Sequence, residues 1–309
     1  MTGRSMRKLK VLVVDDDPSF ANALAESLNL HGIFAEKETV SLNVEKRVRA
    51  TQYDVVFLDA ILPDYDGIEV MLDIATFSPS TKVLLATSKG GRELVAECMR
   101  IGACAFVEKN PQLSPETYVK KVLEVAAGLP PVQDEGVRRE LLIKYLWRRT
   151  KLATKPQRRG RALEKLMKNV LESVPAVFKN AETPIVTGIR EQIDIEFEVG
   201  GSDPFWSSYR PVGYAECKNW LEDTGPVQGG ELHKFYGKLQ GRTGCKLGFF
   251  IGMSGFAEGF KEIWVSVARG GILIVPINHR GLEELVNASE REPIFRKFAK
   301  NALRQRISL

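Results

Sequence analysis

Apolar runs and amphipathic stretches alternate regularly over the first 128 residues. The apolar runs predict strands at Lys10–Asp15, Ile33–Glu36, Val55–Asp59, Lys82–Ala86 and Ala105–Glu108. Three of these runs are continuously aliphatic, which is typical of strands buried on both faces. The stretches between them predict helices at Phe20–Leu30, Gly67–Thr76, Arg92–Ile101 and Pro115–Ala127. The alternation predicts an α/β, doubly wound (βα)5 domain with its functional edge at the C-terminal ends of the strands.

The pattern changes after residues 128–131, where glycine and two prolines interrupt the chain. Helices are expected from Asp134 to about Lys151 and from about Arg161 to Val174, with a break at 154–156. Strands are expected near Ile185–Val186, Ile193–Val199, Val212–Lys218, Leu247–Ile251 and Ile272–Pro276. Further helices are expected at Glu231–Gln240, at Phe256–Ala268 and after Gly281. This predicts a domain at 1–129, a helical linker at 130–157 and a mixed α/β domain at 158–309.

Charge separates the two halves of the 309-residue chain. Residues 1–130 contain 15 Lys/Arg and 18 Asp/Glu, whereas residues 131–309 contain 29 and 21. The net +8 of the second part suggests an anionic partner. The four cysteines show no metal-ligand or disulfide spacing, and the N-terminal apolar run is too short for a signal peptide. No stretch is long enough to span a membrane. Because the cysteines show no disulfide pattern, a reducing, cytoplasmic setting is expected.

Polar residues stand at four of the predicted strand ends, namely Asp15 with Asp16, Asp59, Thr87 and Lys109. Because parallel strands end at one edge of a sheet, these residues should form an acidic pocket with one hydroxyl and one ammonium group. Carboxylates can hold a magnesium ion, while the lysine and the hydroxyl can bind phosphoryl oxygens. Any single aspartate could instead cap a helix. The ordered set indicates a phosphoryl acceptor.

The segment from about residue 9 to 128 resembles the receiver domain of two-component response regulators. The matching residues are Val13–Asp16, Leu58–Pro63 with Asp66 and Gly67, Ala86–Ser88 and Val107–Lys109. The resemblance implies that Asp59 accepts a phosphoryl group from a sensor histidine kinase. The implied magnesium ligands are Asp15, Asp16, Asp59 and the carbonyl of Ile61. The implied switch residues are Thr87, Phe106 and Lys109.

Two positions modify this expectation. Phe106 stands where the family often has a tyrosine, so one hydroxyl is missing from the switch. Ile61, two residues beyond the acceptor, is apolar and lies near the path of an attacking water. Apolar bulk there should hinder the access of water, which predicts slow self-dephosphorylation.

The second half contains no convincing helix-turn-helix, since prolines or strands interrupt its helices. It contains Asp194 on one predicted strand and, on the next, Glu216 and Lys218, which share a face. Two carboxylates can bind a divalent metal and a lysine can orient a water, which is chemistry suited to phosphodiester hydrolysis. Charged alternation on an edge strand produces the same spacing, so the spacing alone leaves both interpretations open.

The order of elements from about residue 158 to 280 resembles the restriction-endonuclease-like PD-(D/E)xK superfamily, especially its Mrr-like branch. The segments that carry the resemblance are the helix with Glu164, Asp194, Glu216–Lys218, Glu231–Lys238 and Leu247–Phe256. The resemblance implies a metal site of Asp194 and Glu216 for Mg²⁺ or Mn²⁺, with Lys218 orienting water or stabilising charge. Glu164 would be an auxiliary acid.

Two features of this region are ambiguous. Residues 200–209 form either a substrate-contacting hairpin or a tolerated insertion. Lys234 and Lys238 either touch phosphates or form a solvated helix face, and the solvated face is the preferred interpretation.

The connector between the two domains is strongly basic. Residues 138–168 contain 12 Lys/Arg and two acids. Such a segment can bind phosphates without sequence preference, although a charge run is often only a solvated face. The candidate nucleic-acid contacts are Arg148, Arg149, Arg158, Arg159 and Arg161. An apolar stripe at 141–147 either packs on its own domain, pairs two protomers or relays the state of the receiver.

The combined prediction is a phosphorylation-controlled response regulator whose output domain is a magnesium-dependent endonuclease. The expected substrate is nucleic acid, with DNA favoured over RNA. A homodimer is expected, because cleavage of both strands needs two sites. One alternative is a catalytically inactive nuclease-like domain that only binds DNA. Another is an adaptor that binds a protein partner.

Overall fold

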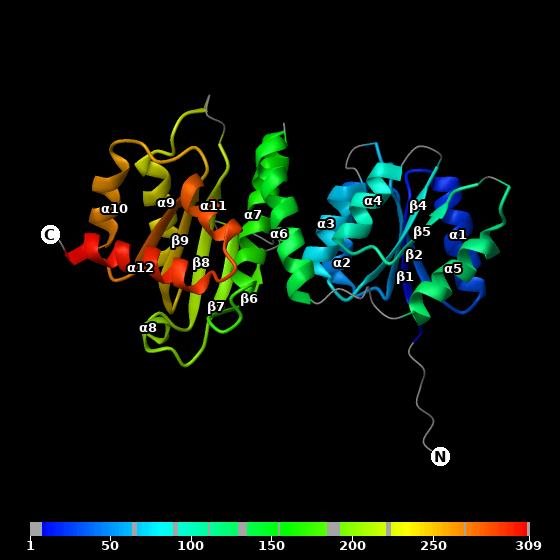
Figure 1. Cartoon of the computed structure of the whole chain (residues 1–309), viewed down its shortest axis with the longest axis horizontal. Helices are drawn as coiled ribbons and strands as arrows, with labels where there is room; N and C mark the ends of the chain where they lie inside the picture. Colours follow the sequence, from blue (N-terminus) through cyan, green and yellow to red (C-terminus); the bar gives the residue numbers. More distant parts are fainter. Residues whose placement is uncertain are drawn as a thin grey trace, which may run out of the picture. The chain divides into compact units, whose positions relative to one another are not determined.

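The structure is a computed structural model that describes residues 8–63, 67–88, 92–110, 112–128, 135–153, 155–183, 192–220, 224–268 and 270–307. The chain divides into two compact units, Met1–Leu142 and Ile143–Leu309. The division falls within helix α6 (Glu135–Leu152). Each unit contains one five-stranded sheet (Figure 1). Among the described residues, no helix is both long and apolar enough to cross a membrane.

The N-terminal unit contains a parallel sheet in the order β2-β1-β3-β4-β5. Its strands are β1 (Lys10–Val14), β2 (Phe34–Glu38), β3 (Val55–Asp59), β4 (Lys82–Thr87) and β5 (Ala105–Glu108). Its helical segments are α1 (Pro18–Leu30), η1 (Ser41–Asn43), α2 (Val44–Ala50), α3 (Gly67–Phe77), α4 (Arg92–Ile101) and α5 (Pro115–Ala127). In Figure 1, α1 and α5 cover one face of the sheet, and α2, α3 and α4 cover the other. The predicted five-stranded α/β fold is confirmed.

The central strands are buried because their aliphatic runs have no polar face. Every residue of β3 is buried, as are the last four residues of β1. Helix α3 starts close to the end of β3. A Cβ on Gly67 would lie 2.6 Å from the carbonyl oxygen of Ala60, so this approach requires glycine.

The C-terminal unit contains a mixed sheet in the order β10-β9-β8-β7-β6. Strands β8, β9 and β10 are parallel, whereas β7 is antiparallel to both β8 and β6. The strands are β6 (Phe178–Glu182), β7 (Ile195–Val199), β8 (Val212–Lys218), β9 (Cys245–Gly252) and β10 (Leu273–Asn278). The helices are α7 (Pro156–Glu172), α8 (Pro204–Ser207), α9 (Gly229–Gln240), α10 (Phe260–Ala268), α11 (His279–Asn287) and α12 (Glu292–Ile307). A central mixed sheet was predicted, and the structure contains one.

Aromatic side chains fill both faces of this sheet. Successive residues of a strand point to opposite faces, so Phe249 and Phe250 of β9 belong to different clusters. Around Phe249 lie Phe178, Phe197 and, from α12, Phe295. Around Phe250 lie Phe235 of α9, Phe256 and Phe260 of α10. Aromatic clusters therefore cover both faces of the sheet around β9.

Several elements differ from the sequence prediction. Helix α2 was not expected, because only two of its seven residues, Val44 and Val48, are buried among charged neighbours. Helix α7 begins at Pro156 rather than near residue 161. Proline suits the first turn of a helix, where its missing N–H would have no partner. Strand β6 was also not expected.

Some expected features lie outside the described residues. They are the strand near Ile185–Val186, Asp66 of the receiver pattern and parts of the two expected breaks, at 129–131 and 154.

Residues 200–209 contain α8 and lie in the connection between the antiparallel strands β7 and β8. The carboxylate of Asp203 caps the helix by accepting hydrogen bonds from the N–H groups of Phe205 and Trp206. Trp206 is fully buried against Phe178, and its indole Nε1 donates to Glu292 at 2.6 Å. The segment is therefore anchored to the core and to α12, and both sequence interpretations of it stay predictions.

Candidate phosphoryl-acceptor and metal sites

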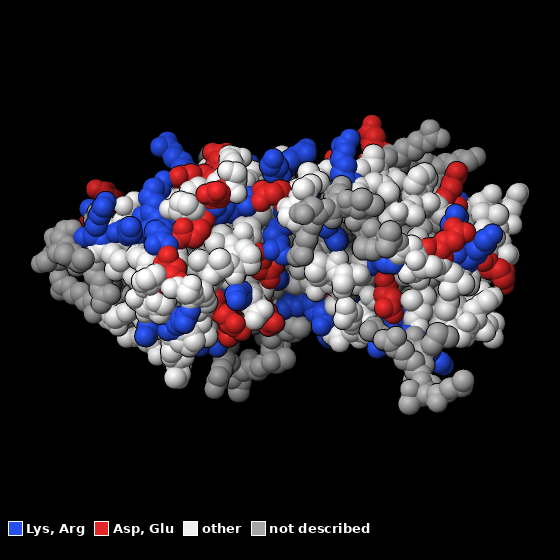
Figure 2. Space-filling view, turned by 60° about the horizontal axis from the view of Figure 1, so that its bottom comes forward, with Lys and Arg blue, Asp and Glu red and all other residues white. Residues whose placement is uncertain are grey.

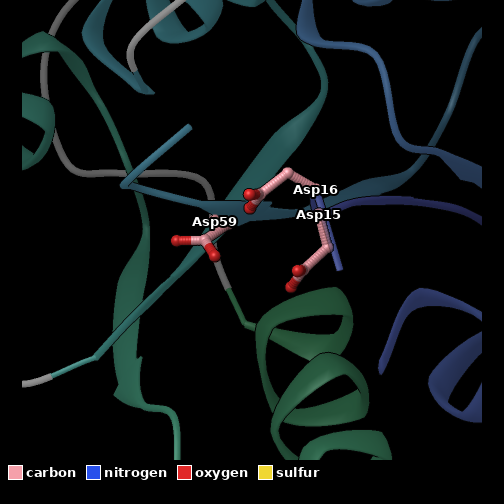
Figure 3. A group of neighbouring side chains, drawn as sticks. All are labelled: Asp15, Asp16 and Asp59. Atoms are coloured by element: carbon pink, nitrogen blue, oxygen red, sulfur yellow. The ribbon is translucent and has the colours of Figure 1, made fainter. Parts of the chain in front are cut away.

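Three carboxylates meet at the ends of β1 and β3 (Figure 3). Asp15 and Asp16 follow β1, and Asp59 ends β3. One carboxylate oxygen from each lies within 4.8 Å of the others. Asp15 and Asp59 are buried, whereas Asp16 is exposed. The neighbouring Asp17 has a different role, since it accepts from the N–H of Ser19 and caps α1. Helix capping is thus served by Asp17, and the other three are available for a ligand.

These residues fit a hard divalent cation. Oδ2 of Asp15 is buried and lies 2.7 Å from Nζ of Lys109, without the alignment of a hydrogen bond. Burial, as the largest cause, raises the pKa of Asp15 to about 6. A cation held by these oxygens would offset that cost of burial, as magnesium does with carboxylate ligands.

Lys109 and Thr87 complete the site. Nζ of Lys109 donates to Oδ2 of Asp59 at 2.6 Å. Burial lowers the pKa of Lys109, but its two carboxylate partners outweigh burial and leave that pKa raised. The backbone N–H of Lys109 donates to the carbonyl of Thr87 at 2.8 Å, which holds the two residues side by side. The four predicted strand ends therefore converge, and Lys109 pairs with the carboxylate of Asp59.

The two modified positions also lie at this edge. The ring of Phe106, on β5, is exposed, with 58% of the residue accessible. The N–H of Ile61 donates to Oδ1 of Asp59 at 2.9 Å, and Ile61 is 47% exposed. The backbone of Ile61 therefore contacts the Asp59 carboxylate, and shielding of that group by the apolar side chain stays a prediction.

The fold and this acidic site define a receiver-type domain, and comparison with known proteins gives the same result. Residues 11–122 match the family model of the response regulator receiver domain. The chain is 31% identical over 122 residues to chemotaxis protein CheY of Listeria monocytogenes, a match that covers 38% of this chain and 98% of that protein. The chain therefore belongs to the response regulator receiver family through its N-terminal domain.

A further relative also matches about a third of this chain. The transcriptional regulatory protein ZraR of Klebsiella oxytoca is 31% identical over 105 residues, which are 34% of this chain and 24% of that protein. The chain thus spans about a quarter of that relative's length. A CheY-like receiver domain structure from Methanospirillum hungatei is 21% identical, with a TM-score of 0.37 and coverage of 39% of this chain and 94% of that one. Receiver domains bind Mg²⁺ in the acidic site and take a phosphoryl group from a donor such as a sensor histidine kinase.

The structure also brings together the three main residues predicted in the C-terminal unit. Asp194 immediately precedes β7, and its Oδ2 accepts the N–H of Cys217 on β8 at 2.7 Å. Nζ of Lys218 lies 3.0 Å from Oε1 of Glu216. Glu216 is 4% exposed, so its charge lies in a buried setting. Two carboxylates and one ammonium group thus share one edge of the sheet, where β7 and β8 run antiparallel.

Lys238 of α9 is a residue of this cluster for which the preferred sequence interpretation was wrong. Its Nζ donates to both carboxylate oxygens of Glu216, at 3.0 and 3.2 Å, and to the carbonyl of Gln192 at 2.7 Å. Lys234, one turn earlier, has a side chain that is 71% exposed and pairs with Glu231. The two lysines have the same helical pattern in the sequence. Only the position of α9 against β8 distinguishes them.

Burial, followed by the charge of Glu216, raises the pKa of Asp194 to about 6.

Glu164 lies apart from the other residues that were predicted for this site. It is half-buried on α7, and its charge raises the pKa of Cys217. The side chain of Cys217 faces away from that of Glu216 on β8. Burial, then Asp194, then Glu164 raise the pKa of the Cys217 thiol. Glu164 therefore borders the cluster from the Cys217 side.

Asn219 links this cluster to the basic helices. It follows Lys218 directly, and its Nδ2 donates to the carbonyl of Arg159 at 2.9 Å and to that of Thr150 at 3.2 Å. These carbonyls belong to α7 and α6. The ends of two helices are thus tied to the strand that carries Glu216 and Lys218, a role that the sequence pattern did not indicate.

The predicted nucleic-acid contacts differ in their exposure. Arg148 and Arg161 are exposed, and Arg149 and Arg158 are half-buried. Arg159 is only 5% exposed and so is not presented to a nucleic-acid backbone in this conformation. On the face drawn in Figure 2, basic and acidic side chains are interspersed rather than gathered into one basic area. In the apolar stripe of α6, Trp147 is buried and packs on the ring of His279.

Proposed function

We propose that this protein is a response regulator whose C-terminal unit is a divalent-metal-dependent endonuclease acting on DNA. The observation that carries the proposal is the convergence of Asp194, Glu216 and Lys218 at one edge of the mixed sheet. Carboxylates in a buried setting favour a cation, and an adjacent ammonium group favours an anion such as a phosphodiester. The restriction-endonuclease-like fold is part of this proposal.

Each residue has a distinct task in this mechanism. Asp194 and Glu216 hold Mg²⁺ or Mn²⁺, which when bound polarises the phosphoryl oxygen and makes water more acidic. The hydrogen bond from Cys217 fixes the carboxylate of Asp194. Lys218 is held 3.1 Å from Glu231, which fixes its ammonium group beside Glu216, and there it would orient a water or stabilise developing charge. Glu164 is an auxiliary acid from the opposite side of β8.

Phosphorylation of Asp59 by a sensor histidine kinase is proposed to control this site. The change at Lys109 and Thr87 would alter either access to the site or the pairing of two protomers. Two protomers would supply the two sites that double-strand cleavage needs. The exposed arginines of α6 and α7 would add affinity for the phosphate backbone that falls with rising salt.

A second candidate function has its own support. Glu216 is paired with Lys218 and Lys238 together, so its charge is already balanced by the chain itself. A carboxylate neutralised in this way suits a nuclease-like domain that only binds DNA or a protein partner. This alternative gives the C-terminal unit a role in recognition without hydrolysis.

A cleavage and binding assay distinguishes the two functions. The full chain is incubated with Mg²⁺ or Mn²⁺ and either plasmid or short duplex DNA, at several salt concentrations. The nuclease proposal expects cleavage that is lost in Asp194→Ala and Lys218→Ala and kept in Lys246→Ala, on an exposed position of β9. Binding without cleavage, unchanged in Lys218→Ala, would support the second function and reject the first.

A further inference from the structure

Lys238 links α9 to both segments that carry the carboxylates of the C-terminal site. Its Nζ donates to Glu216 on β8 and to the carbonyl of Gln192, two residues before Asp194. The charge of Lys238 also lowers the pKa of Asp194, whereas burial, the largest cause, raises that pKa. The side chain is only 16% exposed. A largely buried ammonium group therefore pairs with Glu216 and holds the segment that leads to Asp194.

The other lysine of the cluster is held differently. Lys218 forms ion pairs with both Glu216 and Glu231, at 3.0 and 3.1 Å. One of its two acidic partners, Glu231, is therefore not a proposed metal ligand. Lys238, in contrast, donates hydrogen bonds to both carboxylate oxygens of Glu216, which is a proposed metal ligand. A cation bound by Glu216 would therefore compete directly with Lys238 for the same two oxygens.

We infer that Lys238 is an internal competitor for the divalent cation at this site. This inference rests on the proposed metal-dependent function. In the metal-free chain, Lys238 balances the buried charge of Glu216, and metal binding requires the ammonium group to be displaced. An opposite charge within 3 to 4 Å contributes strongly in a buried setting, because the effective dielectric constant is low. Lys238 therefore weakens the affinity of the site for metal.

Removal of the charge should strengthen metal binding. The test uses the full chain carrying Asp15→Asn and Asp16→Asn, which weaken the receiver site, so that Mn²⁺ titration reports on the second site. Mn²⁺ affinity is measured by calorimetry and by electron paramagnetic resonance. Lys238→Met should bind Mn²⁺ tighter by about tenfold or more. Lys234→Met, on the same helix but exposed, should leave the affinity unchanged.

Further variants keep the test decisive if Lys238→Met does not fold. Lys238→Gln retains a donor for the Gln192 carbonyl without the charge and should also bind Mn²⁺ more tightly. Lys238→Arg retains the charge and should bind as weakly as the parent chain. Glu216→Gln should abolish the binding, which assigns the signal to this site.

Equal or weaker Mn²⁺ affinity in Lys238→Met and Lys238→Gln would overturn the inference, as would binding that survives Glu216→Gln. Absence of binding in both the parent and the neutral variants would overturn it together with the proposed metal dependence. Tighter binding in the neutral variants, with no cleavage in any variant, would uphold the inference and reject the nuclease. Cleavage that needs Asp194 and Lys218, with unchanged Mn²⁺ affinity in the neutral variants, would uphold the nuclease and reject the inference about Lys238.

Discussion

The two acidic clusters of this chain are made of similar groups but differ in their charge balance. At the receiver site, three aspartates lie together, and the one lysine of the cluster, Lys109, pairs with two of them, Asp15 and Asp59. In the C-terminal unit, Asp194 and Glu216 lie with Lys218 and Lys238. The first cluster keeps an excess of negative charge, which attracts a cation. The second is balanced by its own lysines, so it must rearrange before a cation can bind.

The architecture explains this difference. The receiver cluster is formed almost entirely at the ends of parallel strands, which bring their terminal side chains to one edge. The C-terminal cluster lies where β7 and β8 run antiparallel, and a helix, α9, supplies its second lysine. A strand-end site is therefore assembled by the sheet, whereas the second site also depends on the position of a helix.

The largest expected effect is the loss of phosphorylation when the proposed acceptor, Asp59, is replaced. Asp59→Asn should abolish phosphoryl transfer from acetyl phosphate or another small phosphodonor, because the nucleophilic carboxylate is gone. Asp17→Asn is the matched control, since asparagine also caps helices and Asp17 caps α1. Phosphoprotein is quantified by mass spectrometry or Phos-tag electrophoresis. Equal labelling of Asp59→Asn and the parent chain would remove Asp59 from its assigned role.

The next effect concerns the balanced cluster. Glu216→Gln should lower the rate of DNA cleavage by about 100-fold, since it removes a proposed metal ligand at nearly constant volume. Glu198→Gln on β7, where Glu198 accepts from Asn180, is the control and should cleave at the parental rate. Initial rates are measured by gel with labelled duplex DNA. A loss of the same size in both variants would point to general electrostatics rather than a metal site.

A smaller effect is expected on stability. Asn219→Ala should lower the free energy of unfolding by about 1–2 kcal/mol, because two helix carbonyls lose a partly buried donor. Gln228→Ala removes a similar amide that donates to the carbonyl of Pro226 at an exposed site, and should change stability little. Urea denaturation of both variants measures the difference. Equal stability of the two variants would show that Asn219 does not anchor the helices.

The smallest effect concerns the lifetime of the phosphorylated receiver. Ile61→Asn should shorten the lifetime of the Asp59 phosphoryl group by roughly threefold, because a polar side chain at this half-exposed position admits and orients water. The decay is followed after removal of the phosphodonor, with Ile61→Val as the apolar control. A lifetime that is unchanged or longer in Ile61→Asn would contradict the shielding role of Ile61.

The sequence predicted those features that depend on strand pattern. Strands such as β3 and β8 occur at the predicted positions, because continuous burial leaves a strong apolar signal. Asp15, Asp16, Asp59 and Thr87 could be found for the same reason, since each ends or directly follows such a strand. Helix α2 and strand β6 could not, because each buries only two residues.

Tertiary contacts account for the rest. Lys238 and Lys234 have the same appearance on α9, and only the approach of that helix to Glu216 buries one of them. Asn219 reads as an ordinary residue after a strand until α6 and α7 place their carbonyls beside it. Arg159 was grouped with surface arginines, although the turn of α7 directs it inward. Such roles depend on which helix face meets the sheet, which a single sequence does not specify.

The central claim is that the phosphorylation state of the receiver controls metal-dependent cleavage by the second site. The most direct measurement compares DNA cleavage by the full chain with and without a phosphodonor, in Mg²⁺, for the parent, Asp59→Asn and Asp194→Asn. The account predicts that the phosphodonor changes the rate of the parent, leaves that of Asp59→Asn constant, and finds no cleavage by Asp194→Asn. Equal rates for all three proteins, with or without the donor, would contradict it.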